Sequence, residues 1–208
     1  MRTWLLIGLL SCASWAFADV SVTLGCQRLH LKLDAHLTSA VVEQQWGSGE
    51  ESMAKPAVLE LHGCKGELQD SMVLEAPLAR LDPTALRGTI APTILVSVDL
   101  TAAAGSYNGP LTIPVEVHDG HLKRASANTE NKQSEPINLG LTGKAAWKKI
   151  AKRSGDELYS VRCQPKGDGF VTSYYRYYST RQGWKVRMRS EPGLWESDGE
   201  FPSMRHFR

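Results

Sequence analysis

Residues able to bind a charged partner gather near the C-terminal end of the sequence. Four tyrosines and an arginine fall between positions 170 and 178, and basic residues alternate with apolar ones from Trp184 to Arg189. Tyrosine rings offer rigid contact area, and guanidinium groups bind carboxylate or phosphate through two parallel hydrogen bonds. The alternative is ordinary cross-strand aromatic pairing beside a solvated basic face. We predict a binding surface on a β-hairpin, composed of Tyr175, Tyr177, Lys185, Arg187 and Arg189.

A pair of histidines is the strongest candidate for metal binding in the sequence. His118 and His121 flank Asp119-Gly120, and a two-residue hairpin loop would place the two imidazoles opposite each other, where they could hold Zn²⁺ or Cu²⁺ weakly. The Asp-Gly pair is already explained by the turn that it favours. No further ligand stands at local spacing, and solvation explains His30 on its strand. We therefore predict no metal and no cofactor.

An acidic cluster near the C-terminus, Glu196, Asp198 and Glu200, is the best candidate for catalysis. Paired carboxylates can serve glycoside hydrolysis, and several carboxylates can bind Ca²⁺. Gly199 and Pro202 indicate that the cluster lies in a loop. The sequence lacks a glycine-rich phosphate loop, a His-Glu-x-x-His helix and paired Cys-x-x-Cys motifs. The hypothesis that the protein is an enzyme is therefore less favoured, although catalytic triads can assemble from distant residues.

The first eighteen residues have the pattern of a secretory signal peptide. Arg2 precedes an apolar run from Trp4 to Leu10, and Ala16-Phe17-Ala18 provides the small residues of a cleavage site. We predict cleavage after Ala18 and export to the bacterial periplasm or beyond. The alternative is a lipoprotein in which Cys12 becomes the lipidated first residue. No later stretch approaches the roughly 18 apolar residues of a transmembrane helix.

Three cysteines remain after position 18: Cys26, Cys64 and Cys163. In an oxidising compartment we expect one disulfide and one unpaired thiol. We favour Cys26 with Cys64, because both end β-like runs in the same part of the chain. For Cys163 we favour a small buried residue within a strand over a reactive thiol.

Apolar and polar residues alternate with a period of two in most of the sequence, which is typical of half-buried strands. Leu29, Leu31 and Leu33 alternate with polar residues, and positions 93–100 are rich in β-branched residues. Three strands are expected near 157–163, 170–178 and 184–190. Positions 142–153 suggest a short amphipathic helix that Gly155 ends. The predicted fold is mainly β, with an antiparallel β-sandwich-like N-terminal portion and a C-terminal three-stranded meander with one short helix.

The charge pattern divides the sequence after the signal peptide (1–18) into a β-sandwich-like portion (19–125), a polar linker (126–143) and a basic, aromatic-rich meander portion (144–208). From position 19 to 143 there are 9 basic residues against 15 acidic ones, whereas from 144 onwards there are 14 against 7. The two parts can attract each other, or the basic part can bind an acidic partner.

The function that we expect is that of an exported, non-enzymatic binding protein that recognises an acidic surface of another protein, as an inhibitor, immunity or envelope-assembly protein would. Nucleic acid is not expected, because exported proteins rarely meet it. The alternatives are an envelope hydrolase acting on glycan or peptide, with the acidic cluster as its catalytic groups, and a binder of anionic polysaccharide.

Overall fold

The computed structural model describes residues 20–35, 37, 54–99, 105–131, 133–197 and 200–208. The signal-peptide prediction and Asp198 lie outside these residues. The described residues form a mainly β fold with a single short 3-10 helix, η1 (Met204–Phe207). Within them, no helix has the length and apolar character that crossing a membrane requires.

The first sheet contains four antiparallel strands in sequence order: β1 (Val20–Leu24), β2 (Gln27–Lys32), β3 (Val58–His62) and β4 (Leu68–Val73). Its leucines at alternate positions point inward, as their spacing predicts, and leave a polar outer face. The Cys26–Cys64 disulfide joins the β1–β2 turn to the β3–β4 turn across a Cα–Cα distance of 4.8 Å, which confirms the predicted pairing.

The second sheet is built around β6 (Thr93–Asp99) and β7 (Pro110–His118). Its order is β11-β7-β6-β5, and β8 also pairs with β7; the remaining strands are β5 (Ala79–Leu81), β8 (His121–Arg124) and β11 (Leu139–Gly140). The predicted hairpin between β7 and β8 is present, with φ of 51° at Asp119 and 78° at Gly120. An Asp-Gly pair adopts these left-handed angles readily.

The third sheet has the order β10-β9-β15-β14-β13-β12. The three predicted strands correspond to β13 (Gly155–Lys166), β14 (Gly169–Thr180) and β15 (Gly183–Pro192). β9 (Ser126–Asn128) and β10 (Ser134–Pro136) come from the segment predicted as a polar linker, as does β11 of the second sheet. The described part of this segment therefore belongs to two sheets.

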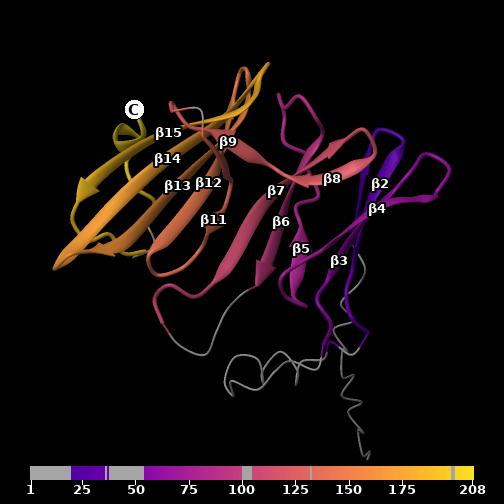
Figure 1. Ribbon diagram of the computed structural model, residues 1–208, viewed down its shortest axis with the longest axis horizontal. Coiled ribbons are helices and arrows are strands. Elements are labelled where there is room, and N and C mark those ends of the chain that lie inside the picture. The colour runs from indigo at the N-terminus through magenta and orange to yellow at the C-terminus, as the bar shows by residue number, and fades with distance from the viewer. Residues whose placement is uncertain (1–19, 36, 38–53, 100–104, 132, 198–199) are drawn as a thin grey trace, which may run out of the picture.

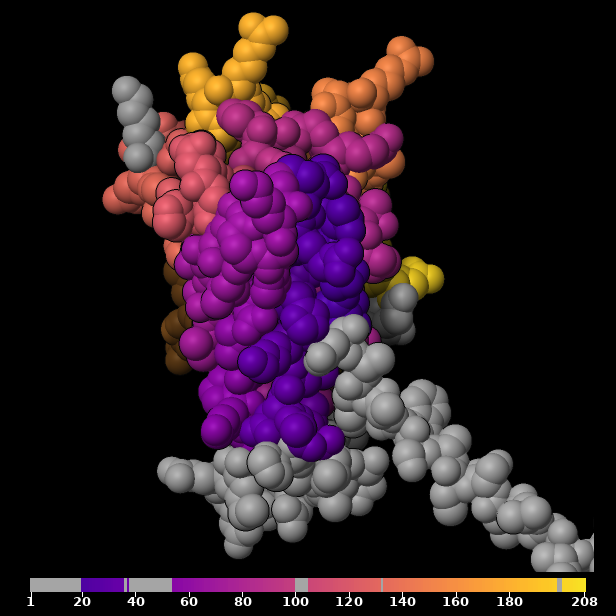
Figure 2. All heavy atoms as spheres, turned by 90° about the vertical axis from the view of Figure 1, so that its right-hand side faces the viewer, coloured from indigo at the N-terminus to yellow at the C-terminus, as the bar shows by residue number. Residues whose placement is uncertain are grey.

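The three sheets stack as layers, with the second sheet in the middle (Figure 1). On β6, Ile94, Val96 and Val98 pack against the first sheet, whereas Leu95 packs with residues of the third. Burial on both faces explains the continuous apolar run from Ile94 to Val96 in this strand. Figure 2 looks onto the outer side of the first sheet, where β1 to β4 cover the layers behind them. A third apolar cluster lies on the outer face of the third sheet, where η1 covers Tyr159 and Tyr174.

The helix predicted at 142–153 is wrong: β12 (Ala145–Lys152) occupies this stretch and pairs with β13 over eight residue pairs. Ala146 and Ile150 share a face in a helix and also in a strand, because their spacing of four satisfies both periods. They pack in the outer cluster, while Trp147 packs on the opposite face against the middle layer. An isolated helix of this length is marginal in water, so the neighbouring strand decides the conformation.

Glycines allow the second and third sheets to approach closely beside the β12–β13 turn. A Cβ on Gly88 would lie 2.4 Å from the Ser154 carbonyl oxygen, and a Cβ on Gly155 would lie 2.6 Å from the Arg87 carbonyl oxygen. The Asp156 amide donates to that Arg87 oxygen at 2.9 Å, and the Asp156 carboxylate accepts from the Arg87 side chain at 2.8 and 3.1 Å. The parts of the chain before and after position 144 are thus joined by backbone and side-chain contacts.

Candidate functional site

The five residues of the predicted binding surface divide between the two faces of the third sheet. Lys185 pairs with Tyr178, Arg187 with Arg176, and Arg189 with Tyr174, so these side chains share the outer face. Tyr175 and Tyr177 pair with Met188 and Val186 on the inner face. Tyrosine rings therefore do lie beside the basic residues on the outer face, but they are Tyr174 and Tyr178; the prediction that Tyr175 and Tyr177 belong to this surface is wrong. Both strands are longer than predicted and their loop is shorter, and the resulting pairing differs by one residue, which changes the face.

The outer face carries a hydrogen-bonded group of charged and aromatic side chains. Arg176 donates to both carboxylate oxygens of Glu157 at 2.7 and 2.9 Å, and the Tyr159 hydroxyl donates to Glu157 at 2.5 Å. Burial raises the pKa of Glu157, but these hydrogen bonds outweigh burial and hold its pKa below the usual 4.5. Burial and the Glu157 carboxylate raise the pKa of Tyr159 to about 12. The Glu157 carboxylate thus already has its hydrogen-bond donors within the protein. This group of side chains stabilises the sheet.

The basic residues of β15 differ in how far they are already neutralised. Arg189 donates to Glu191 at 3.0 Å, and His206 also approaches Glu191 at 3.4 Å. Arg187 lies over the Tyr178 ring at 5.9 Å. Within the described part of the chain, neither Lys185 nor Arg187 pairs with a carboxylate. These two cations are therefore the strongest attraction for an acidic group on this face.

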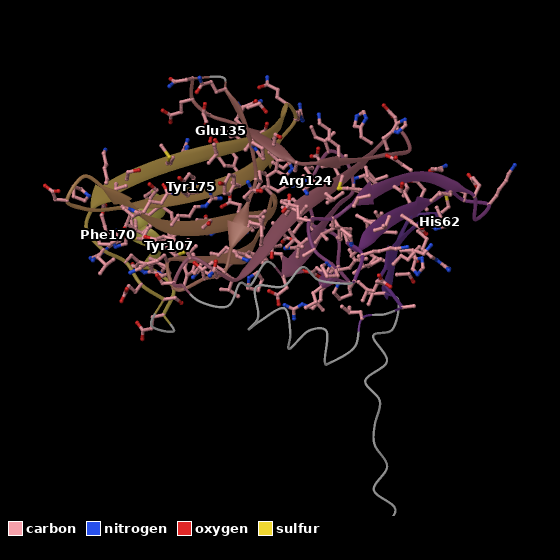
Figure 3. All side chains as sticks on the ribbon, turned by 60° about the horizontal axis from the view of Figure 1, so that its bottom comes forward. His62, Tyr107, Arg124, Glu135, Phe170 and Tyr175 are labelled. Carbon is pink, nitrogen blue, oxygen red and sulfur yellow. A yellow bond between two sulfur atoms is a disulfide. The ribbon has the colours of Figure 1, made fainter. Side chains whose placement is uncertain are left out.

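The inner face holds a small aromatic pocket next to the same strand. Tyr175 and Tyr177 stack with ring centroids 6.0 Å apart and an interplanar angle of 5°. A pocket of about 180 Å³ lies between these rings, Met188 and the β9–β10 hairpin, from which Glu135 also lines it (Figure 3). Tyr177 is only 5% exposed, and burial raises its pKa to about 12, whereas Met188 is 63% exposed. An apolar side chain can therefore reach Met188 and Tyr175 but not the Tyr177 ring face.

β15 has an open edge along most of its length. It pairs in parallel with β9 at Trp184 and Lys185 alone, and no described strand pairs with Val186–Pro192 on the side away from β14 (Figure 1). Thr180 and Gly183 close a two-residue hairpin loop and form a hydrogen-bonded pair. By the alternation of an antiparallel ladder, the amides of residues 186, 188 and 190 then point away from β14. The parallel pairing of Lys185 with Asn128 uses the amide of residue 186, so the amides of residues 188 and 190 face the open edge. The basic face and the aromatic pocket meet along this edge.

The other candidates from the sequence are placed apart from this edge. Glu196 forms an ion pair with Lys144, while Asp198 lies outside the described residues. His118 and His121 are opposite each other, as predicted, but are 64% and 76% exposed and approach different carboxylates, those of Asp119 and Asp70. Cys163 is an unpaired thiol, 1% exposed, within β13.

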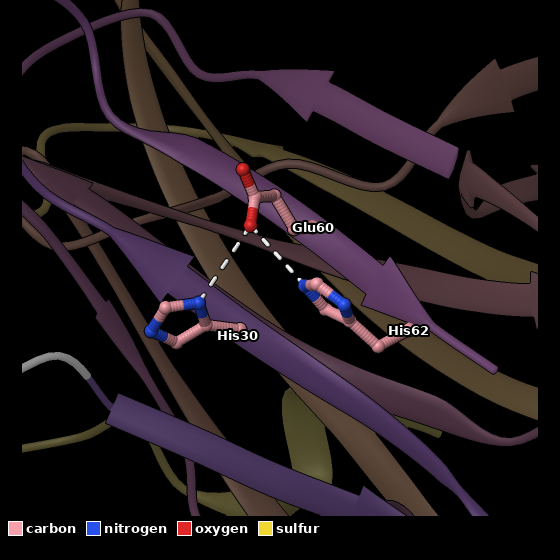
Figure 4. A group of neighbouring side chains, drawn as sticks. All are labelled: His30, Glu60 and His62. Atoms are coloured by element: carbon pink, nitrogen blue, oxygen red, sulfur yellow. Dashed lines mark hydrogen bonds and ion pairs between the residues drawn. The ribbon is translucent and has the colours of Figure 1, made fainter. Parts of the chain in front are cut away.

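A group that sequence reasoning missed lies on the outer face of the first sheet. His30, Glu60 and His62 offer ligand atoms that all lie within 4.8 Å of one another, and Figure 4 shows both imidazoles turned toward the carboxylate. Burial raises the pKa of Glu60, but the His62 hydrogen bond and the Lys32 charge outweigh it and hold the pKa below 4.5. The alternation of residues 29–33 places His30 on a polar face, but the sequence does not reveal that β3 lies beside it.

No protein-family model, no curated protein and no solved structure matches this chain. The candidate sites therefore rest on their own geometry.

Proposed function

We propose that the protein is an exported, non-enzymatic binding protein that recognises an extended, acidic segment of another protein by adding it as a strand to the edge of β15. The open edge between Val186 and Pro192 carries this proposal, because it lies between a basic face and an aromatic pocket. Backbone amides of such an edge supply affinity, and side-chain pockets on alternate faces supply specificity.

The two faces define the chemistry of the partner segment. Successive side chains of an added strand point to opposite faces of the sheet. On the outer face they would meet Arg187, with Lys185 next to the end of the added strand, which favours Asp or Glu. On the inner face they would meet Met188 and Tyr175, which favours an apolar residue. The preferred segment therefore alternates acidic and apolar residues, and it is attracted by the basic part of the chain.

The disulfide supports the proposed location. Cys26 and Cys64 are bonded, and such bonds persist in oxidising compartments such as the bacterial periplasm or the outside of the cell. The signal-peptide pattern in the first eighteen residues is in accord with export. The buried state of Cys163 favours its role as a packing residue over that of a reactive thiol.

The test is affinity capture of proteins from an envelope extract, followed by measurement of affinity for the captured protein. Arg187→Glu with Arg189→Glu should weaken binding at least about 10-fold, and added salt should slow association. Met188→Pro should weaken it similarly, because proline removes an amide from the open edge without removing a hydrogen bond to β14. Lys123→Glu with Arg153→Glu makes the same charge change on exposed positions elsewhere and should bind normally.

Each variant addresses one element of the proposal. A partner that binds the Arg187/Arg189 variant with unchanged affinity would exclude the basic face. Normal binding by Met188→Pro would exclude strand addition. If anionic polysaccharide alone is retained, and is released by salt, the polysaccharide alternative replaces the proposal. Turnover of peptidoglycan that is lost in Glu196→Gln but kept in Arg187→Glu would establish the hydrolase alternative.

A further inference from the structure

We propose that His30, Glu60 and His62 form a binding site for one divalent transition-metal ion, such as Zn²⁺ or Cu²⁺, on the outer face of the first sheet. Two imidazoles and one carboxylate are a common ligand set for such ions, with the remaining position left to water or to another ligand. This inference goes beyond the proposed protein binding and concerns a different sheet.

The positions of the three side chains follow from strand register. His30 on β2 lies directly opposite Glu60 on β3, and His62 lies two residues beyond Glu60 on the same face. The His62 Nε2 atom is 3.2 Å from Glu60 Oε2, and the His30 Nδ1 atom is 3.7 Å from that same oxygen (Figure 4). Ligand atoms about 2.0–2.1 Å from a tetrahedral zinc ion are separated by roughly 3.3 Å, so small rotations bring the set onto one ion.

The other ring nitrogen of His62 makes the kind of hydrogen bond to the backbone that orients histidines in metal sites. Its Nδ1 atom lies 3.2 Å from the Gly66 carbonyl oxygen, which can only accept, so Nδ1 carries the proton. The Nε2 atom then faces Glu60 Oε2, with which it shares a hydrogen bond at 3.2 Å. A metal ion bound to Nε2 would take the place of the proton between the same two atoms. Backbone carbonyls that accept from the distal nitrogen orient ligating histidines in the same manner.

The disulfide and the turn beside it hold this arrangement. Gly66 stands in the β3–β4 turn, where its amide donates to the Gly63 carbonyl and the Gly63 amide donates to the Glu67 carbonyl. Cys64 in this turn is bonded to Cys26, which directly precedes β2 and lies two residues before Arg28. A hollow of about 450 Å³, lined by both histidines and both cysteines, gives an ion access from solvent.

Nearby positive charge limits which ions the site can hold. The Lys32 ammonium lies 3.7 Å from Glu60 Oε1, and Arg28 lines the hollow. Ca²⁺ and Mg²⁺ prefer several oxygen ligands and would gain little from two imidazoles. Transition ions bind imidazole nitrogen strongly enough to compete, and Lys32, which is exposed, can turn away.

The test is calorimetric titration of the purified, untagged protein with Zn²⁺ and with Cu²⁺, with the disulfide intact. We expect one ion per chain, no binding of Ca²⁺, and at least about a 100-fold loss of affinity in His30→Asn with His62→Gln. His118→Gln with His121→Gln removes the other cross-strand histidine pair and should bind normally. In the Cu²⁺ complex, electron paramagnetic resonance should show coupling to imidazole nitrogen that disappears in the His30/His62 variant.

Lys32→Gln keeps the test decisive if the double variant does not fold. Removing the ammonium group beside Glu60 should tighten binding by about 10-fold. Unchanged or weaker binding in Lys32→Gln, retained binding in the His30/His62 variant, or loss in the His118/His121 variant would each overturn the proposed site. Because these variants leave β15 intact, failure here and failure of the proposed partner binding are separate results.

Discussion

At the scale of single residues, the outer face of the third sheet shows how a buried carboxylate is stabilised. Glu157 accepts from Arg176 twice and from the Tyr159 hydroxyl, and its side chain is almost inaccessible to water. Arg176 also lies 5.4 Å from the centre of the Tyr178 ring. Removing one partner of a buried ion pair leaves the other charge without compensation, which is costly even when the intact pair contributes little.

We therefore predict that Glu157→Gln lowers the free energy of unfolding by about 2–3 kcal/mol at neutral pH. The lower end allows for the partial exposure of Arg176. Urea denaturation followed by tryptophan fluorescence measures the change. Lys185→Gln, which removes a charge from the same face without a carboxylate partner, should change stability by less than about 0.5 kcal/mol. Equal effects of the two substitutions would show that the Glu157 ion pair is not needed for stability.

At the scale of elements, the C-terminal segment acts as a cover for the outer face of the third sheet. Phe207 of η1 packs edge-on against Tyr159 and Tyr174, with ring centroids 5.2 and 5.4 Å apart. Phe201 stacks on Phe207 at 5.5 Å. A short 3-10 helix has little stability of its own, so these aromatic contacts keep it on the sheet.

Phe207→Ala should lower the free energy of unfolding by about 3–4 kcal/mol, because it removes a buried aromatic ring and leaves a cavity above Tyr159. Leu194→Ala, at an exposed apolar position of the same C-terminal segment, is the matched control and should have little effect. Thermal unfolding followed by circular dichroism measures both. A small effect of Phe207→Ala would mean that the C-terminal cover contributes little to stability.

The sequence predicted the elements that depend on local pattern. Strict alternation marked β2, the Asp119-Gly120 pair marked the β7–β8 hairpin, and β-like runs marked β13 to β15. The cysteine pairing was also correct. In each case the deciding information lies within a few neighbouring residues, or in the small number of possible pairings.

The features that the sequence could not predict depend on contacts between distant segments. β12 satisfies helical and strand spacing alike, and only pairing with β13 decides between them. The tyrosines at 175 and 177 face away from Arg187 because of a hairpin register that alternation alone does not fix. The His30–His62 group requires that β2 and β3 be neighbours, although a long segment separates them in the sequence.

At the scale of the whole molecule, the acidic N-terminal part and the basic C-terminal part are joined by more than net charge. Leu95 and Leu158 belong to one apolar cluster between the second and third sheets. The Trp184 indole donates to Glu116 at 3.1 Å, and Lys149 donates to Asp82 at 3.1 Å. In the Lys149–Asp82 pair the basic part supplies the cation and the acidic part the anion, as the charge asymmetry predicts. In the Arg87–Asp156 pair the acidic part supplies the cation instead. Local geometry rather than net charge therefore selects the contacts.

The Arg87–Asp156 contact should make the stability of the molecule depend on pH. Burial raises the pKa of Asp156, but hydrogen bonds from the Arg87 side chain and backbone outweigh burial and hold its pKa below the usual 3.8. As pH falls, the unfolded chain therefore takes up a proton at this residue before the folded protein does. The stabilisation is complete above about pH 5, begins to decrease as pH approaches 3.8, and is lost once pH has passed below the folded pKa.

Asp156→Asn should consequently lower the free energy of unfolding by about 1–2 kcal/mol at pH 7, a modest value because the Arg87 side chain is exposed. The difference between the variant and the wild type should shrink as pH falls below about 4, because protonation abolishes the same charge in the wild type. Urea denaturation at pH 7, 5, 4 and 3 measures this convergence. Asp168→Asn removes an exposed carboxylate from the β13–β14 turn and controls for the charge change. A difference that stays constant down to pH 3 would assign the effect of Asp156 to packing or to neutral hydrogen bonds, and the charge of the Arg87–Asp156 pair would then have no part in joining the two sheets.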